Sequence, residues 1–369
     1  MNPLASSLPD FPWDTLADAR ALAVSHPDGL VDLSVGTPVD PTPQVAQAAL
    51  QAAADAPGYP ATWGTPELRR AIINYLAIRW QAAGLDDAGV LPVLGTKELV
   101  ALLPALLGLG ADDTVVIPAT AYPTYDVGAR IARAQVVATD DPAEAASLRP
   151  KLIWINSPAN PHGRILSVVQ TRAWVAAARA AGALLARDEC YGEFGWEAEP
   201  VSVLHPAVND GSHERLLAVH SLSKRSNVAG YRAGFVAGDP RVVAELLEVR
   251  KHAGMILPAP IQAAMTALLG DTAHVEQQRA RYLRRRALLR PALEAAGYRI
   301  EFSEGSLYLW CTRGEDGRAS VRHLAGLGIL VAPGDFYGEA GRQFVRVALT
   351  ATDEQIEAAS DRLHAAALQ

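Results

Sequence analysis

The sequence predicts an α/β fold, in which a large domain built on a mostly parallel sheet is joined to a small α+β domain. Short apolar or β-branched runs alternate with alanine-rich helical segments through most of the chain, and a helical segment such as residues 168–181 separates two such runs. Towards the C-terminus the strand-like runs follow one another more closely. A chain of 369 residues is long enough for more than one domain.

The expected elements follow from these runs. Buried strands are predicted at residues 114–118, 135–139, 152–156, 183–186, 216–219 and 235–237. In the small domain we expect a helix over 275–296, strands at 298–302, 306–311, 329–332 and 344–349, and a helix over 353–367. We therefore predict an N-terminal arm with part of the small domain at 1–40, a large domain at 41–275 and the rest of the small domain at 276–369.

Composition narrows the class of protein. A chain that is 50% hydrophobic and 20% charged has the balance of a globular enzyme, and a net charge of −7 disfavours nucleic-acid and acidic-membrane surfaces. The arginines between 279 and 290 would spread around several faces of a helix, which favours a solvated helix over a binding patch.

Cysteine content and the chain start bear on location. Cys190 and Cys311 are too few for a disulfide framework or a metal site, so we expect no metal and a reducing, cytoplasmic location. Residues 1–7 lack the basic start and apolar run of a signal peptide, and the longest apolar stretch, 100–109, is too short to span a bilayer.

One lysine carries the strongest chemical signal. Lys224 follows an apolar run. Ser221 and Ser223 stand just before it, and Arg232 follows eight residues later. Burial at a strand end disfavours the charged amine and lowers its pKa, and only a neutral amine attacks a carbonyl. The serines and the arginine suit a phosphate. Together they indicate pyridoxal 5′-phosphate (PLP), with its aldehyde linked to Lys224.

A second phosphate-binding segment is Gly95-Thr96-Lys97, which opens a helical run. Free amides at a helix start and a threonine hydroxyl can bind a phosphate, although alone the segment could equally be a helix cap. It is not a P-loop, because the earlier glycine of that motif is absent.

Polar residues also follow two neighbouring strands. Asn160 could donate its amide to a phenolate oxygen, and the plain alternative is a turn. Asp188, if buried, needs a positive partner such as a protonated pyridine nitrogen, whereas a loop carboxylate would be solvated. Tyr191 could hydrogen-bond the same phenolate oxygen.

Two further residues complete the set. Tyr122 could stack on a flat ring, or merely fill the core. Arg346 stands inside an apolar strand, so its guanidinium should face a carboxylate, either of a substrate or of the protein itself. The order of these residues at successive strand ends favours one PLP site over unrelated structural roles.

These motifs resemble those of fold-type I PLP enzymes, specifically the class I/II aminotransferases, from about residue 30 to the C-terminus. The resemblance implies that Lys224 is the Schiff-base lysine, Asp188 the partner of the pyridine nitrogen, and Asn160 and Tyr191 the phenolate-oxygen ligands. It implies that Tyr122 stacks on the ring and that Arg346, with Gly36 in the loop above it, binds the substrate α-carboxylate. The implied phosphate ligands are Gly95, Thr96, Lys97, Ser221, Ser223 and Arg232, with Tyr59 lent by the partner subunit of a homodimer.

A narrower resemblance concerns the substrate. Segments 8–14, 32–40, 188–191 and 223–227 are similar to those of actinobacterial N-succinyldiaminopimelate aminotransferases. This implies exchange of an amino group between glutamate and an N-succinylated keto-pimelate in lysine biosynthesis. His162 and Ser306 depart from the threonine and alanine common at those positions.

Several alternatives stay open. The amino donor could be aspartate, an aromatic amino acid or histidinol phosphate, and a PLP-dependent carbon–sulfur β-lyase would use the same cofactor residues. A PLP-binding transcription regulator would need a DNA-binding domain, for which too few residues precede Gly36. The substrate's distal carboxylate needs a cation, for which the candidates are Arg20, Lys97, Arg164 and Arg225.

Overall fold

The computed structural model describes residues 4–368, so residues 1–3 of the N-terminal segment and residue 369 lie outside it. Within that range the main sheet has seven strands in the order β2-β8-β7-β6-β5-β3-β4. Their bounds are β2 Val90–Val93, β3 Thr114–Ile117, β4 Gln135–Ala138, β5 Leu152–Asn156, β6 Leu184–Asp188, β7 Leu216–Ser221 and β8 Gly234–Gly238. The six predicted strands are all present.

The sheet is mixed rather than wholly parallel. β3, β4, β5, β6 and β7 pair in parallel, whereas β8 is antiparallel to both β7 and β2. The prediction of a mostly parallel sheet is confirmed. The prediction that residues 135–139 form a buried strand is wrong, because β4 lies at the sheet edge and its residues are exposed or half-buried.

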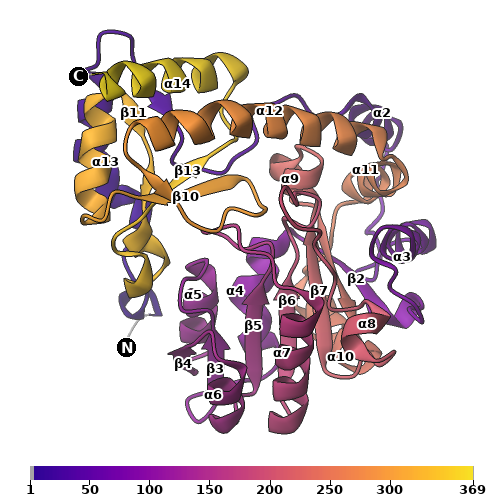
Figure 1. The fold of residues 1–369 in the computed structure, drawn as a ribbon. Coiled ribbons are helices and arrows are strands. Elements are labelled where there is room, and N and C mark those ends of the chain that lie inside the picture. The colour runs from indigo at the N-terminus through magenta and orange to yellow at the C-terminus, as the bar shows by residue number, and fades with distance from the viewer. Residues whose placement is uncertain (1–3, 369) are drawn as a thin grey trace.

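Helices cover both faces of the sheet (Figure 1). They are α1 Ala17–Val24, α2 Gln44–Ala52, α3 Pro66–Trp80, α4 Thr96–Leu106, α5 Thr124–Ile131, α6 Pro142–Ser147, α7 Val168–Ala181, α8 Pro206–Asn209, α9 Leu222–Arg225, α10 Pro240–Ala253, α11 Ala259–Gly270, α12 Ala273–Ala295, α13 Gly317–Gly326 and α14 Asp353–Ala367. Short 3-10 turns lie at Leu4–Ser7, Pro12–Leu16, Asp87–Gly89, Ala229–Tyr231, Gly334–Tyr337 and Glu339–Gly341.

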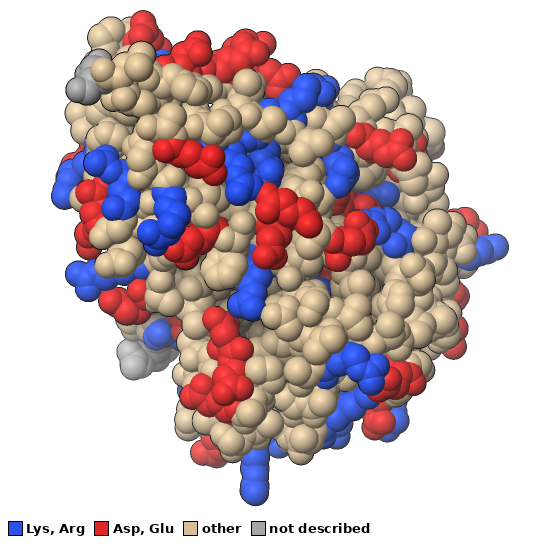
Figure 2. Space-filling model, in the orientation of Figure 1, with Lys and Arg blue, Asp and Glu red and all other residues tan. Residues whose placement is uncertain are grey.

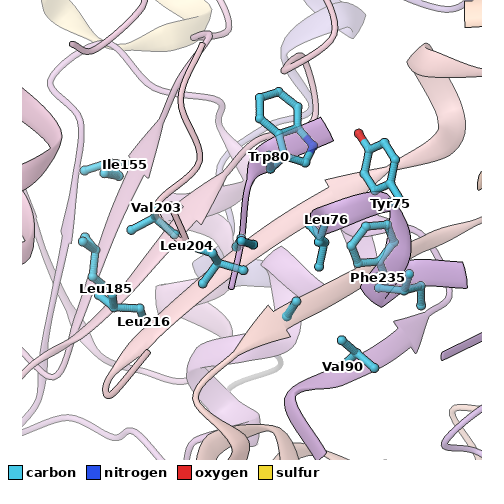
Figure 3. Packing of buried hydrophobic residues seen from close by; sticks show 14 of the residues in the cluster. Tyr75, Leu76, Trp80, Val90, Ile155, Leu185, Val203, Leu204, Leu216 and Phe235 are labelled. Carbon is cyan, nitrogen blue, oxygen red and sulfur yellow. The ribbon is translucent and has the colours of Figure 1, made fainter. Parts of the chain in front are cut away.

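Two hydrophobic cores lie on opposite faces of the main sheet. Along β5, Ile153 and Ile155 belong to one core, while Leu152 and Trp154 belong to the other. Successive strand residues point to opposite faces, so this alternation means that the strand is buried on both sides. Figure 3 shows the first core, where side chains of α3 such as Leu76 pack near Phe235 of β8. A sheet covered on both faces leaves its strand ends as the place for a site.

The C-terminal elements form a second, smaller sheet beside the N-terminal segment. Its order is β12-β13-β10-β9, with β9 Arg299–Ile300, β10 Tyr308–Thr312, β12 Ala332–Pro333 and β13 Val345–Ala348. β1 Val31–Asp32 pairs in parallel with β11 Ile329–Leu330, so the start of the chain joins this part. The domain boundaries at 40 and 275 stay a prediction.

One predicted strand of this part is wrong. The run at 329–332 was expected as a single strand, but it divides at Val331 into β11 and β12, which pair with different strands. An apolar run does not reveal which strand it will pair with, so the sequence of residues 329–332 does not indicate that the run divides into two strands.

The arginine-rich helix α12 also differs from expectation. Arg285 is 2% exposed and binds the carboxylates of Asp40 and Asp353, while Arg286 and Arg290 both bind Glu197. Figure 2 shows basic and acidic side chains interspersed on the face that α12 crosses. The arginines therefore hold α12 against neighbouring segments, and α12 is not simply a solvated helix.

Among residues 4–368, no helix combines the length and the apolar character that a bilayer span requires.

Candidate active site

A cavity of about 650 Å³ lies at the strand ends of the main sheet. Strand ends of β5, β6 and β7, the start of α4 and the small sheet all contribute to its wall. The sequence-predicted site residues that line it are Gly36, Thr96, Lys97, Tyr122, Asn160, Asp188, Tyr191, Ser221, Ser223, Lys224, Arg232 and Arg346. The topology thus brings together residues that are far apart in sequence.

Lys224 occupies the short helix α9 directly after β7. Ser221, the last residue of β7, caps α9 by accepting a hydrogen bond from the Ser223 amide at 3.1 Å. The Lys224 ammonium donates to the carbonyl oxygen of Gly36. Burial, with the nearby Arg346 guanidinium second, lowers the pKa of Lys224 to about 8. The neutral amine that covalent attachment to an aldehyde requires is therefore more abundant near neutral pH than it is for an ordinary lysine.

Asp188 is the last residue of β6 and is 6% exposed. One carboxylate oxygen accepts from the Cys190 amide at 3.0 Å and the other from the Tyr125 hydroxyl at 2.8 Å. Within the described chain it forms no ion pair, and burial raises its pKa. The solvated-loop alternative is therefore wrong, and a cationic ring nitrogen would supply the positive charge that this buried group lacks.

Arg346 lies on β13 and is 2% exposed. Its guanidinium donates to the side-chain oxygen of Asn160 at 2.9 Å and to the carbonyl oxygen of Ser34 at 2.7 Å, while its Nε has no partner. No carboxylate of the described residues pairs with it, so the alternative of an internal salt bridge is wrong. A buried guanidinium with an unused donor suits a ligand carboxylate.

The phosphate-binding candidates meet at the start of α4. Gly95 has a φ of +78° and precedes the first helical residue, Thr96. A Cβ at Gly95 would stand 2.4 Å from the Arg232 guanidinium, so only glycine admits this close approach. Free amides of a helix start, hydroxyls of Ser221 and Ser223 and one arginine form a cradle for a phosphate.

Tyr59 lies apart from the predicted site residues that line the cavity. Its side chain is fully exposed and does not line the cavity. Its predicted role in a partner's phosphate site is not tested by one chain.

Sequence reasoning did not find several residues in the cavity wall or directly behind it. Tyr125, on α5, lies behind the wall and donates to Asp188, and Tyr122 precedes α5, so no helical spacing joins the two tyrosines. Asn156 bridges the loop, since its side chain accepts from the Asn160 amide at 2.7 Å and donates to the Asp188 carbonyl at 2.9 Å. Tyr308 lines the cavity from β10 with no sequence signal beyond an aromatic in a strand.

The donor set fits PLP. A buried carboxylate without a cation, a lysine of lowered pKa and a phosphate cradle at the strand ends of this sheet define a PLP-dependent enzyme of fold type I. The chain belongs to the family described as aminotransferase class I and II, whose model matches residues 28–363. It is therefore a PLP-dependent aminotransferase.

Known proteins refine this placement. A probable aminotransferase of Mycobacterium tuberculosis is 61% identical over 98% of this chain and 86% of its own length. The 4-dedimethylamino-4-oxo-anhydrotetracycline transaminase OxyQ of Streptomyces rimosus is 59% identical over 96% of this chain and 99% of its own. The structure of a probable N-succinyldiaminopimelate aminotransferase from Thermus thermophilus superposes with a TM-score of 0.87 at 27% identity, covering 96% of this chain and 100% of that one.

Replacing Gly95 with alanine should weaken PLP binding about 10- to 100-fold, because the new Cβ displaces Arg232 and removes a charge-assisted hydrogen bond. The dissociation constant of PLP from the variant measures this. The matched control is Gly108→Ala, which has the same backbone strain (φ +72°) but nothing within 4 Å of its Cβ. Equal affinities for PLP in the two variants would contradict the assignment of Gly95 and Arg232 to the phosphate site.

Attachment of PLP to the apo protein should accelerate as pH rises through about 8 and level off above it, because the neutral Lys224 amine is the reactive form. In Arg346→Ala the profile should keep its shape and move to higher pH, since a repelling charge is gone. Stopped-flow absorbance across a pH series checks both. A rate that stays flat from about two pH units below that pKa to about two units above it would refute the assignment of Lys224.

Proposed function

We propose that this aminotransferase exchanges an amino group between glutamate/2-oxoglutarate and N-succinyl-LL-2,6-diaminopimelate/N-succinyl-2-amino-6-oxopimelate. It would thus be a succinyldiaminopimelate transaminase of lysine (diaminopimelate) biosynthesis, acting in the cytoplasm as a homodimer. The observation that carries the proposal is a pair of cations, Arg20 and Lys97, on the wall of a large cavity that also holds Arg346. The name of the Thermus thermophilus neighbour supports the same substrate.

The chain's own residues divide the chemistry. PLP, when bound, supplies an aldehyde that receives the amino group and a ring that withdraws electrons from the substrate's α-carbon. Arg346 binds the carboxylate next to the reacting amine and so orients the α-carbon. Lys224, as a neutral amine, would take the proton from that carbon and deliver it to the former aldehyde carbon of the cofactor, which is the proton transfer that amino-group exchange requires. Asp188 keeps the ring nitrogen protonated, and Asn160 and Tyr191 donate to the ring oxygen. Because one substrate leaves before the next binds, ping-pong kinetics are expected.

Two of the four candidates for the distal cation lie outside the cavity that holds Lys224. Arg164 lines a separate cavity and lies 5.5 Å from the centre of the Phe302 ring. Arg225 is 3% exposed and bound to Glu193 at 3.2 Å. Neither lines the cavity that holds Lys224, so neither would reach the substrate there.

Arg20 and Lys97 differ in how they are held. Arg20 is paired with Asp32 at 2.5 Å, so part of its charge is already neutralised. Lys97 forms no ion pair within residues 4–368, and its ammonium lies 5.8 Å from the centre of the Phe11 ring. N-Succinyl-diaminopimelate carries two carboxylates beyond the reacting end. We assign the first distal carboxylate to Lys97 and leave Arg20 for a second.

The homodimer is supported by Tyr59. An aromatic side chain that is fully exposed gains nothing from its position in a single chain. In a dimer it would reach the partner's phosphate cradle, as the family resemblance implies.

A panel of single half-reactions tests the substrate. The holoenzyme is mixed with N-succinyl-LL-2,6-diaminopimelate, glutamate, aspartate, phenylalanine, histidinol phosphate or a cysteine conjugate, and loss of the yellow colour of the bound cofactor is followed. We expect the first two donors to exceed the others in kcat/KM by about tenfold or more, and 2-oxoglutarate to restore the colour. A faster reaction with aspartate, phenylalanine or histidinol phosphate would overturn the substrate. Pyruvate and ammonia from the cysteine conjugate would indicate a β-lyase.

The identity with OxyQ supports a second candidate, a flat polycyclic ketone as amino acceptor. Phe11 and Trp13 line the cavity and could stack on such rings. Colour restored by 4-dedimethylamino-4-oxo-anhydrotetracycline faster than by N-succinyl-2-amino-6-oxopimelate would favour this candidate.

Replacing Lys97 with alanine should raise KM for N-succinyl-diaminopimelate about 10- to 100-fold with little change in KM for alanine, which has no distal carboxylate. Steady-state kinetics with both donors measure this. Arg20→Ala serves as the matched comparison, and a larger effect there would transfer the assignment to Arg20.

A further inference from the structure

Tyr308 contacts two of the residues to which the reaction assigns a role, Tyr191 and Arg346. It is the first residue of β10, is 3% exposed and lines the cavity. β10 pairs with β13, which carries Arg346. The tyrosine therefore stands between the small sheet and the cofactor side of the cavity.

The hydroxyl of Tyr308 lies 2.9 Å from the hydroxyl of Tyr191, and the two rings meet edge to face with centres 5.6 Å apart. The Tyr191 hydroxyl makes no other hydrogen bond within residues 4–368. When Tyr308 donates to Tyr191, the proton of Tyr191 is free to point towards the ring oxygen of the cofactor. The direction of this one hydrogen bond thus decides whether Tyr191 can act as a donor.

The ring of Tyr308 meets a different group. The guanidinium carbon of Arg346 lies 4.0 Å from the ring centre, the geometry of a cation–π contact. On the loop above, an added Cβ at Gly36 would stand 2.0 Å from the Tyr308 hydroxyl, so the backbone of that loop packs directly on the tyrosine. The hydroxyl of Tyr308 therefore meets Tyr191 and the Gly36 loop, whereas the face of its ring meets Arg346.

We propose that Tyr308 is a positioning residue with two separable functions. Its ring orients Arg346 towards the substrate carboxylate, and its hydroxyl orients Tyr191 towards the cofactor oxygen. The inference rests on the roles proposed above for Arg346 and Tyr191, which their own variants test separately.

Tyr308→Phe removes only the hydroxyl. A less well oriented Tyr191 stabilises the anionic ring oxygen less, so the pH titration of the bound cofactor's absorbance should move to higher pH. KM for the amino donor should change less than about twofold, because the ring still contacts Arg346. In a Tyr191→Phe background the same change should produce no further shift.

Tyr308→Leu also removes the ring. The affinity for maleate, an unreactive dicarboxylate, should fall about 3- to 30-fold relative to Tyr308→Phe, and KM should rise in parallel. Tyr298→Phe is the control. It also removes the hydroxyl of a buried tyrosine, but this hydroxyl lies 3.1 Å from Nδ1 of His323, and neither residue lines the cavity. It should leave the titration and maleate binding unchanged.

The outcomes distinguish a failure of the functions proposed for Tyr308 from a failure of the roles proposed for Tyr191 and Arg346. If Tyr191→Phe shifts the titration and Tyr308→Phe does not, the function of the Tyr308 hydroxyl is refuted. If Arg346→Ala weakens maleate binding and Tyr308→Leu does not, the function of the ring is refuted. If neither Tyr191→Phe nor Arg346→Ala has an effect, the proposed site roles themselves fail. Equal shifts in Tyr298→Phe would attribute the effects to general destabilisation and overturn the inference.

Discussion

Charged groups buried in one cavity without partners of opposite charge are the constraint on which the rest of this site depends. Asp188 and Arg346 are nearly inaccessible, and neither has an ion-pair partner among residues 4–368. Such burial is costly, and the protein offsets it only in part, with hydrogen bonds from Tyr125 and Cys190 to Asp188 and from Arg346 to Asn160. A cationic ring nitrogen beside Asp188 and a substrate carboxylate beside Arg346 would supply the opposite charges. Apo protein should therefore gain stability when PLP binds, because ligand charge replaces missing solvation.

The topology explains how these groups come to one place. Asp188 and Lys224 follow β6 and β7, which are parallel neighbours, so their carboxyl ends share one edge. Arg346 arrives from another sheet, on β13, and its contact with Asn160 links that sheet to the loop after β5. The N-terminal strand β1 pairs with β11, which fixes the loop that carries Gly36 above Lys224. The start and the end of the chain are thus both needed to close a site whose chemistry lies in the middle.

The sequence predicted where a residue lies when its chemistry and its position along a strand agreed, as for Asp188 and Lys224, which line one cavity. It failed where pairing decided the outcome. Nothing in residues 329–332 shows that β11 and β12, which Val331 separates, will pair with strands of different sheets, because tertiary packing sets the partners of a strand. Tyr308 was invisible for a related reason. An aromatic in a strand usually fills a core, and only the register that places β10 beside β13 reveals its contact with Arg346. Tyr59 needs a second chain, which no argument from one chain supplies.

In the proposed function, substrate choice would depend on a different part of the chain from the chemistry. The residues that hold the cofactor and the α-carboxylate come from the strand ends, whose positions the sheet fixes. The wall beyond them includes Phe11, Trp13 and Arg20, from the segment before β1. Arg20 is held by Asp32 of β1, and Trp13 packs on Phe336 at 5.3 Å between ring centres, so this segment is anchored to the β1-β11 pair and to the 3-10 turn Gly334–Tyr337. Within residues 4–368, no hydrogen bond or ion pair joins Phe11, Trp13 or Arg20 to Lys224 or Asp188. An aminotransferase named for a tetracycline precursor is 59% identical to this chain, so identity at that level does not by itself define the substrate.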